Sequence, residues 1–335
     1  MIRVAVDAMG GDYAPDEMIR GAVEAVNQNE NIAVLLVGQE QIIRQKLTEY
    51  TYPEDRMQIV NATEVIDNDE MPTLAIRRKK DSSIVVGMNL VKSGEADAIV
   101  SCGSTGAVLV GGQAIVGRLP SVKRPPLAPL VPTVEGVSLL IDCGANVDAR
   151  AEHLVQFARM GSIYMRDVMG IQQPRVALVN IGAEEEKGNA LVKETMPLLK
   201  ECTDIHFIGS IEARDIPYGK ADVIVCEAFV GNVILKLYEG VGGALIQEIK
   251  QAMLGSTRGK IGALLAKPSL KNVVKKFDSS EYGGAPLLGL NRLVVKAHGS
   301  SNHKEVCNAV LQCETFARQQ ISDKIKTCIQ TDGKE

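Results

Sequence analysis

A turn rich in small residues occupies positions 102–106, where the chain reads Cys-Gly-Ser-Thr-Gly. It follows an apolar run at 97–101 that predicts a buried strand, and it precedes a run at 107–116 that can open a helix. Gly103 and Gly106 permit close backbone approach, Ser104 and Thr105 carry hydroxyl donors, and the first amides of a helix attract anions. The pattern predicts a phosphate cradle, with a turn that binds nothing as the alternative. Neither the Walker pattern nor G-x-G-x-x-G is present, so an ordinary nucleotide site is not indicated.

A second small-residue loop follows the first predicted strand. Residues 2–7 are mostly apolar, as expected of a parallel strand buried on both faces, and Gly10, Gly11 and Asp12 come after them. Asp7 and Asp12 would lie at the carboxyl end of this strand, where open α/β sheets bind ligands. The alternative is structural, with Asp12 as a turn former and Asp16 as a helix cap.

Four more predicted strands end in short polar sequences, at 142–146, 181–188, 227–232 and 298–302. Within the second of these, Lys187 would lie in the first turn of a helix, where a positive charge opposes the helix dipole. A lysine in that position hints at an anionic ligand, whereas the glutamates before it are explained by helix capping. We expect all six loops to gather at one edge of a mainly parallel sheet.

Alternating strands and helices predict an α/β fold, a mainly parallel sheet with flanking helices. The whole chain, 1–335, is expected to form a single catalytic domain of two closely knit lobes. An antiparallel hairpin between 127–131 and 137–142 interrupts the parallel pattern. The predicted strands are 2–7, 31–38, 57–61, 97–101, 175–180, 204–209, 222–226 and 293–297, and the main helices are 16–28, 39–50, 82–93, 148–169, one ending at 253 and one along 306–325.

Composition excludes several classes of protein. The net charge of −4, the 4% of aromatic residues and the absence of Trp argue against nucleic-acid binding, which needs a basic face or a stacking platform. Seven cysteines without a C-x-x-C pair form neither a disulfide framework nor a zinc site, so we expect a reducing cytoplasm and no metal. The first residues read as a strand rather than a signal peptide.

One basic segment, 249–277, has seven positive charges and no acidic residue in a chain that is negative overall. Its apolar residues recur at helical spacing on both sides of Pro268, which predicts two short basic amphipathic helices broken at that proline. Such helices suit an anionic membrane surface or an acidic protein partner; the alternative is a helical hairpin that packs on the protein's own core or on a dimer mate. The expected contact residues are Arg258, Lys260, Leu264, Leu265, Lys267, Lys271, Val273 and Lys275.

The order and spacing of the polar motifs resemble one known family. The motifs are DAMGGDYAP at 7–15, STGA at 104–107, DCGAN at 142–146, IGAEEEKG at 181–188, GN at 231–232 followed by LK at 235–236, YGGAP at 282–286 and KAHGS at 296–300. They resemble the bacterial phosphate acyltransferases of phospholipid synthesis over nearly the whole chain. The resemblance implies transfer of an acyl group from acyl-carrier protein to inorganic phosphate, without a cofactor. It also implies a fold similar to isocitrate and isopropylmalate dehydrogenases and to phosphate acetyltransferases, a homodimer, and peripheral attachment to the cytoplasmic membrane.

The implied reaction suggests roles for individual residues. Phosphate is mostly a dianion at neutral pH and the leaving thiolate departs easily, so no dedicated general base is required. We expect the 104–106 turn and the amides of Gly10 and Gly11 to hold phosphate while Lys187 neutralises its charge, and Asn232 or His298 to donate to the oxyanion. Asn146 and Lys296 join Asp7 and Asp12 as expected substrate-site residues through the resemblance. A covalent acyl-enzyme on Cys102, Cys143 or Cys226 is the rival route.

One departure and two rival functions remain. Where the family usually has Asp-Gly, this chain has Glu227 and Ala228, so either the local turn differs or the carboxylate acts from a shifted position. An NAD-dependent β-decarboxylating dehydrogenase would need a cluster of metal-binding aspartates, which the sequence does not show. A membrane-associated scaffold for acyl-carrier protein would use the basic segment but leave the polar loops unexplained.

Overall fold

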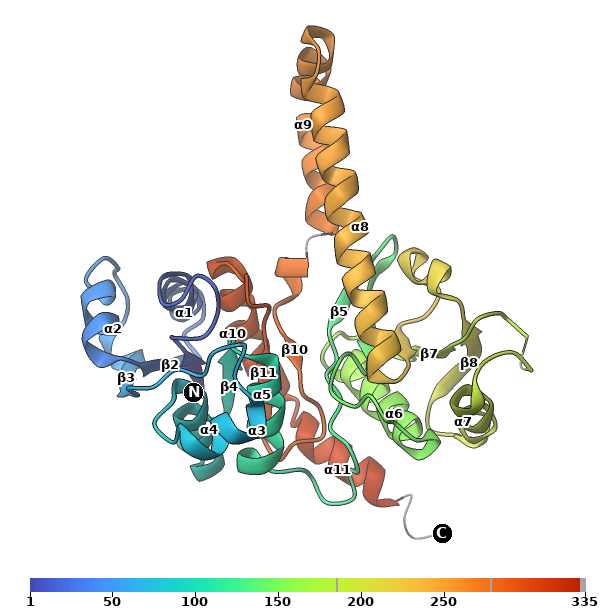
Figure 1. Ribbon diagram of the computed structural model, residues 1–335, viewed down its shortest axis with the longest axis horizontal. Coiled ribbons are helices and arrows are strands. Elements are labelled where there is room, and N and C mark those ends of the chain that lie inside the picture. The colour runs from blue at the N-terminus through green and yellow to red at the C-terminus, as the bar shows by residue number, and fades with distance from the viewer. Residues whose placement is uncertain (185, 278, 332–335) are drawn as a thin grey trace. The chain divides into compact units, whose positions relative to one another are not determined.

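The computed structural model describes residues 1–184, 186–277 and 279–331, and within them the chain folds into two compact units (Figure 1). The first unit contains residues 1–129, 159–173 and 280–335, and the second contains 130–158 and 174–279. The prediction of a mainly parallel α/β fold with flanking helices is confirmed. The expected union of two closely knit lobes in one catalytic domain stays a prediction.

The first unit is built on a six-stranded sheet in the order β10-β11-β4-β1-β2-β3. All neighbours are parallel except β10 and β11. The central strands are buried, and they are apolar except for Ser101 and Lys296 at their last positions, because helices cover both faces of a parallel sheet. The strands are β1 (Ile2–Asp7), β2 (Ile32–Gly38), β3 (Met57–Asn61), β4 (Ala98–Ser101), β10 (Ala285–Pro286) and β11 (Leu293–Lys296).

The helices of the first unit follow the predicted pattern closely. Helix α4 (Ser83–Ser93), for example, begins at an N-cap serine, Ser82, and ends at Gly94, which has a φ of 81°. Helix α1 packs against α10, and the two come so close that a Cβ on Gly21 would lie 2.5 Å from the carbonyl oxygen of His303. The remaining helices are α1 (Asp16–Gln28), α2 (Glu40–Leu47), α3 (Pro72–Arg78), α5 (Thr105–Gly111), which continues as a π-helical turn (Gly112–Val116), α10 (His303–Arg318) and α11 (Ile321–Thr331).

The second unit has its own five-stranded sheet, in the order β5-β6-β9-β7-β8. The predicted hairpin is present as its antiparallel edge, and the other pairs are parallel. The strands are β5 (Leu130–Thr133), β6 (Gly136–Ile141), β7 (Arg175–Val179), β8 (His206–Ile211) and β9 (Val223–Val225), and the helices are α6 (Ala151–Asp167), which continues into the first unit, α7 (Ala190–Glu201), α8 (Ala228–Leu254) and α9 (Thr257–Lys276). Short 3-10 turns lie at Glu54–Arg56, Ala213–Tyr218 and Ser279–Tyr282.

The presence of two sheets corrects one expectation. The six polar loops do not share one sheet edge: those after β1, β4 and β11 belong to the first sheet, and those after β6, β7 and β9 belong to the second. Strand periodicity shows which face of a strand is buried but not which strand lies beside it, so the sequence could not distinguish one sheet from two.

Two predicted helix boundaries were also wrong. Helix α9 runs through Pro268 without a break, and the turn of the hairpin lies before it, between Leu254 and Thr257. Proline removes one backbone hydrogen bond from a helix, and α9 keeps its helical course on both sides of that position. The last predicted helix is divided into α10 and α11 at Gln320, which has a φ of 50°, although the apolar spacing continues across the break.

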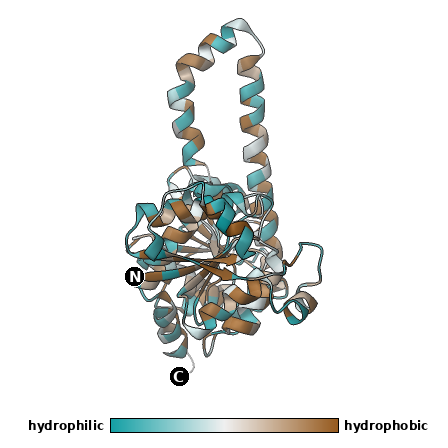
Figure 2. Cartoon of the chain, turned by 90° about the vertical axis from the view of Figure 1, so that its left-hand side faces the viewer, coloured by the Kyte–Doolittle hydropathy of each residue, from teal (hydrophilic) through white to brown (hydrophobic). Residues whose placement is uncertain are grey.

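Helices α8 and α9 form a long hairpin that extends away from the sheet of their own unit (Figure 2). Helix α8 has 27 residues and a mean hydropathy of 1.3 in its most apolar stretch, of which only 6% is buried. By length and composition alone, α8 is the one helix among the described residues that could cross a membrane. Its exposed apolar residues recur every fourth position, at Phe229, Val233, Leu237, Val241, Leu245 and Ile249.

Candidate active site

The loops after β1, β4 and β11 form the first loop cluster, which we define as residues 7–12, 101–106 and 296–301. Backbone hydrogen bonds join them, from Asp12 N to Gly299 O at 2.7 Å and from Ala297 N to Ser101 O at 3.0 Å. The chain runs outward from β1 through β2 to β3 and then returns to β4 on the other side of β1. The carboxyl ends of β1 and β4 therefore flank a topological switch point, the usual ligand position in open α/β sheets.

The predicted strand, turn and helix at 97–116 are present, and α5 begins at Thr105 as expected. Ser104 caps this helix, since its Oγ accepts a hydrogen bond from Ala107 N at 3.4 Å. Ser104 is buried, whereas Thr105 is exposed. Gly106 has a structural role, because a Cβ there would lie 2.4 Å from Pro72 Cγ at the start of α3. The turn thus offers helix amides and one exposed hydroxyl.

Asp7 lies beneath the first loop cluster and has no exposed surface. Its Oδ2 accepts from Ser101 Oγ at 2.6 Å and its Oδ1 from Met9 N at 3.2 Å. Burial raises the pKa of Asp7, and hydrogen bonds from Ser101, Ser83 and the Met9 amide act in the opposite direction. Ser101 Oγ also accepts from Gly103 N at 3.1 Å. These contacts make Asp7 and Ser101 the support of the cradle rather than a surface for an anion.

Glycines 10 and 11 are required by close packing. A Cβ on Gly10 would lie 2.3 Å from Asp7 Oδ2 and 2.7 Å from Gly103 N. Gly11 has a φ of 109°, and a Cβ there would lie 2.9 Å from the Cβ of Cys102. The glycine pair therefore lets the loop after β1 lie directly on the loop after β4.

The third loop of this cluster contains Lys296 and His298. Lys296 is buried and its Nζ donates to the carbonyl oxygens of Ala297 and Cys102. His298 is exposed, and its Nδ1 accepts from Ser300 N at 3.2 Å. A neutral His298 consequently has its proton on Nε2, so Nε2 is the donor nitrogen of the ring.

The loops after β6 and β9 form the second loop cluster, residues 142–146 and 227–232. Asp142 is fully buried, and its Oδ2 accepts from the backbone and side-chain amides of Asn146 at 2.8 and 2.7 Å. Gly231 is required because a Cβ there would lie 1.9 Å from Asp142 O. The expected substrate residue Asn146 is thus buried and holds the loop, whereas Asn232 is exposed on α8.

The departure at Glu227 has a clear structural consequence. Glu227 is the N-cap of α8, and its carboxylate oxygens accept from Phe229 N at 2.6 Å and Val230 N at 2.9 Å. Glu227 has a φ of −82°, so its position does not require glycine. Ala228 is the first residue of the helix, a position that also requires no glycine. The longer side chain therefore caps the helix, as a shorter aspartate commonly does.

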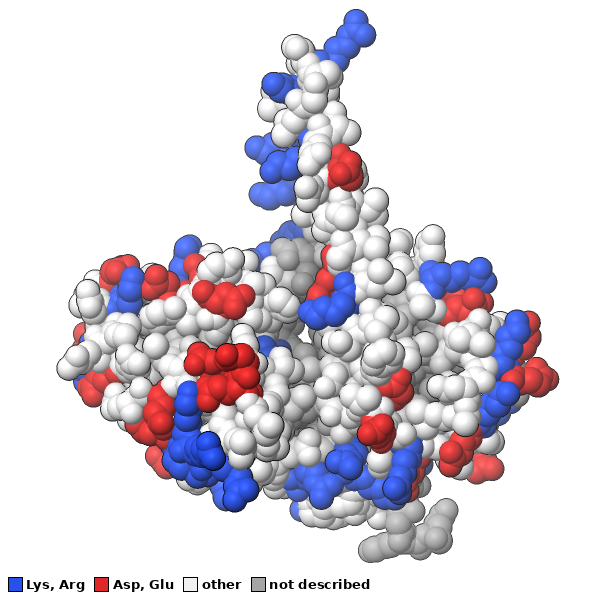
Figure 3. Space-filling model, viewed as in Figure 1, with Lys and Arg blue, Asp and Glu red and all other residues white. Residues whose placement is uncertain are grey.

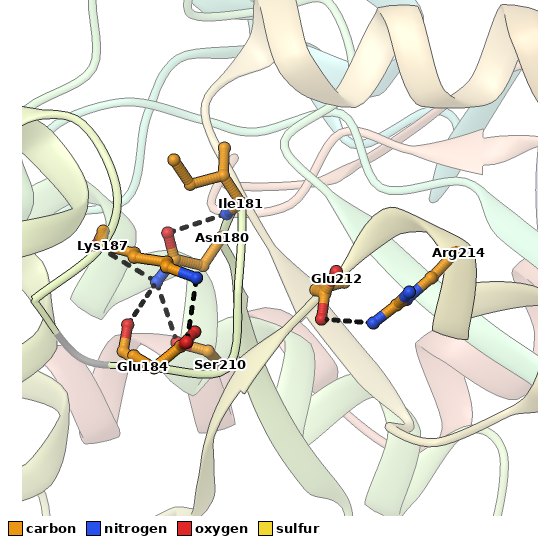
Figure 4. A network of polar contacts seen from close by, with 7 residues as sticks. All are labelled: Asn180, Ile181, Glu184, Lys187, Ser210, Glu212 and Arg214. Carbon is orange, nitrogen blue, oxygen red and sulfur yellow. Dashed lines mark hydrogen bonds and ion pairs between the residues drawn. The ribbon is translucent and has the colours of Figure 1, made fainter.

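Asn180 organises the loop 181–188 in the second unit (Figure 4). Asn180 is buried at the end of β7, and its Nδ2 donates to Ser210 Oγ at 3.2 Å and to Lys187 O at 3.2 Å. A Cβ on Gly188 would lie 2.6 Å from Asn180 Oδ1, so the loop closes tightly around this amide. Glu185 of the same motif lies outside the described residues.

Lys187 does not lie in a helix, which corrects the argument from the helix dipole. Helix α7 begins three residues later, at Ala190, and Asn189 caps it. Lys187 Nζ instead pairs with Glu184 Oε1 at 2.9 Å, and both side chains are about half exposed, 50% and 57%. A hydrogen bond to Glu184 and its charge raise the pKa of Lys187, so the lysine stays positively charged at neutral pH.

Comparison with known proteins settles the family. The model of the family described as fatty acid synthesis protein matches residues 2–324. A phosphate acyltransferase from Desulfitobacterium hafniense (strain Y51) is 50% identical over 327 residues, which is 97% of each chain. One from Clostridium novyi (strain NT) is 46% identical over 329 residues, 98% of this chain and 99% of that protein. The chain belongs to the phosphate acyltransferase family.

Membership in this family makes the protein an enzyme, an acyltransferase. Among solved structures, the EutD phosphotransacetylase from Staphylococcus aureus aligns over 94% of both chains with a TM-score of 0.63 and 16% identity. That likeness shows the fold alone. The relatives at 46% and 50% identity are phosphate acyltransferases, so the dehydrogenase and scaffold alternatives are not favoured.

The three cysteines of the rival covalent route are buried in this acyltransferase. Burial raises the pKa of Cys102 to about 12 and also raises the pKa values of Cys143 and Cys226. A thiol acts as a nucleophile through its thiolate. These three groups are therefore poorly suited to accept an acyl group.

The basic segment is exposed along its length. Leu264 and Leu265 are 72% and 77% exposed, and all eight predicted contact residues, which lie on α9, are exposed. Figure 3 shows Lys and Arg side chains along one flank of the hairpin. The lower end of α9 is tied to the β-hairpin of its unit, because Lys276 Nζ donates to Val134 O.

Sequence reasoning missed two supporting residues, Ser101 and Asn180. Each is a buried polar residue where an apolar strand ends, and each fixes the loop that follows. The signal was available, since a polar side chain in such a position must find an internal partner.

Proposed function

We propose that this enzyme transfers a long-chain acyl group from acyl-carrier protein to inorganic phosphate, giving acyl phosphate for phospholipid synthesis. The observation that carries the proposal is the first loop cluster at the β1/β4 switch point. This cluster contains the buried Asp7–Ser101 hydrogen bond, the closely packed Gly10 and Gly11, and the capped start of helix α5. Such a site suits a small anion better than a nucleotide base.

In the proposed mechanism, phosphate attacks the thioester directly. Phosphate dianion is a competent nucleophile, and the thiolate is a good leaving group. The buried cysteines have raised pKa values, which disfavours a covalent acyl-enzyme intermediate. The attack forms a bond between a phosphate oxygen and the acyl carbon, and it breaks the carbon–sulfur bond of the thioester. The thiolate then takes a proton from His298 or from water. The work of the enzyme is to position phosphate and stabilise the oxyanion.

The residue roles are proposals too. Gly10, Gly11 and the 104–106 turn bind phosphate, with Asp12 beside them, while Asp7, Asn146 and Lys296 hold the loops. Lys187 neutralises phosphate charge, and Asn232 or His298 donates to the oxyanion. The burial of Asp7 and Asn146 and the exposure of Asn232 and His298 support this division of roles.

We also propose a homodimer that attaches peripherally to the cytoplasmic face of the membrane through the hairpin. The support is the combination of exposed leucines and lysines on α9, which suits an anionic lipid surface.

The direct test is formation of acyl phosphate from a long-chain acyl-carrier protein and labelled phosphate, with Lys187→Ala for comparison. We expect labelled product from the wild type and a raised phosphate KM in the variant. Folded wild-type protein that releases no thiol in the presence of phosphate would contradict the proposal.

A further inference from the structure

Lys187 carries the positive charge that the proposed reaction needs for phosphate. In the structure this charge is paired with the carboxylate of Glu184. Lys187 Nζ lies 2.9 Å from Glu184 Oε1 (Figure 4). A free anion that binds Lys187 must therefore displace this carboxylate or lie beside it.

The backbone holds the two residues together. Lys187 N donates to Glu184 O at 3.1 Å, so the two residues are joined by a backbone hydrogen bond as well as by their side chains. Asn180 Nδ2 contacts the carbonyl oxygens of both residues, at 3.5 Å for Glu184 and 3.2 Å for Lys187. The Glu184 side chain can thus swing away from Lys187 while the main-chain turn stays in place.

Both side chains of the pair lie close to Gly182. A Cβ on Gly182 would lie 2.6 Å from Lys187 Cδ and 2.8 Å from Glu184 Oε2. The absence of a side chain at this position therefore lets both side chains lie over the loop.

We propose that Glu184 is a built-in competitor of phosphate, a carboxylate that sets the affinity of the Lys187 site for its anion. The inference rests on the proposed function, because it takes Lys187 as a phosphate ligand. The pair lowers the pKa of Glu184, so the carboxylate remains charged wherever phosphate is a dianion, and a change of pH near neutrality does not relieve the competition.

The test is titration of the full-length protein with inorganic phosphate in a calorimeter, without any acyl donor. Exposed ion pairs are weak, so we expect Glu184→Gln to tighten phosphate binding by about two- to five-fold. Glu186→Gln is the matched control: it removes the same charge from the same loop, and the described residues show no hydrogen bond or ion pair of Glu186. The control should bind phosphate as the wild type does.

A second variant pair separates the contact from a general charge effect. In a Lys187→Ala background, Glu184→Gln should leave phosphate affinity unchanged, because the competed group is gone. In steady-state assays, Glu184→Gln should lower the phosphate KM by the same factor. Urea unfolding confirms that the variants are folded.

Equal or weaker phosphate binding by folded Glu184→Gln would overturn the inference, and so would an equal gain in Glu186→Gln. If the proposed function is wrong, the result is different. The wild type and Glu184→Gln still differ in phosphate affinity, but neither the wild type nor any variant forms acyl phosphate.

Discussion

At the scale of single residues, the polar side chains of the loops divide into buried and exposed groups. Asp7, Ser101, Asn146 and Asn180 are buried and hydrogen-bonded within loops, whereas Asn232 and His298 are exposed. The polar sequences after strands could be predicted as candidate functional loops. The sequence could not distinguish the exposed residues of these loops from the buried ones. Whether a polar residue is buried depends on which loops pack against each other. The spacing of residues in the sequence does not contain that information.

Replacing Ser101 with alanine should weaken the cradle. The change leaves a buried carboxyl group and the Gly103 amide without their shared partner, which costs about 1–3 kcal/mol of unfolding free energy. We expect a lower urea midpoint and a higher phosphate KM. Ser93→Ala, at an exposed serine, should change neither value, and a wild-type midpoint for Ser101→Ala would refute the supporting role.

The pKa of Cys102 predicts its reactivity. Burial raises this pKa to about 12 from an ordinary value of 9.0, so the group is a thiol at neutral pH. In the native protein at pH 8, iodoacetamide should label the partly exposed Cys202 and Cys328 well before Cys102, as read by mass spectrometry of peptides. Labelling of Cys102 at the same rate as Cys202 would reopen the covalent route.

At the scale of elements, local signals were strong for strands and weak for helix ends. The apolar strands and the capped helix α4 were predictable because burial on two faces and a Ser cap leave clear patterns. Helix α9 was predicted to break at Pro268, but it continues through the proline. A proline removes a single backbone hydrogen bond, and the sequence does not show whether the helix continues beyond it.

Helix α8 should depend on its unusual cap. Glu227→Ala leaves the amides of Phe229 and Val230 without their carboxylate, at a cost of about 1 kcal/mol of unfolding free energy. Glu227→Asp should retain most of that stability, because aspartate is a common N-cap. Urea unfolding of the three proteins measures this, and equal midpoints for all of them would show that the cap contributes nothing.

At the scale of the whole molecule, charge is distributed unevenly. The chain has a net charge of −4, yet its segment 249–277 contains seven positive charges and no acidic residue. The order of motifs indicated the family, so the family could be obtained from the sequence. The division into two sheets could not, because neighbouring strands are far apart in sequence.

Attachment to lipid should follow this charge distribution. Replacing Leu264, Leu265 and Val273 with aspartate removes exposed apolar surface and adds negative charge, so sedimentation with anionic liposomes should fall strongly while activity on soluble substrates is kept. Wild-type binding should also weaken as salt rises. A triple variant that sediments like the wild type would remove the proposed anchor.

The most direct test of the account is a quench experiment with acyl-carrier protein labelled in its acyl group. Enzyme and donor are mixed without phosphate, sampled, and then given phosphate. We predict no label on the enzyme and no released thiol in the first sample, followed by labelled acyl phosphate and free thiol in equal amounts. Label bound to the enzyme before phosphate is added would contradict direct attack.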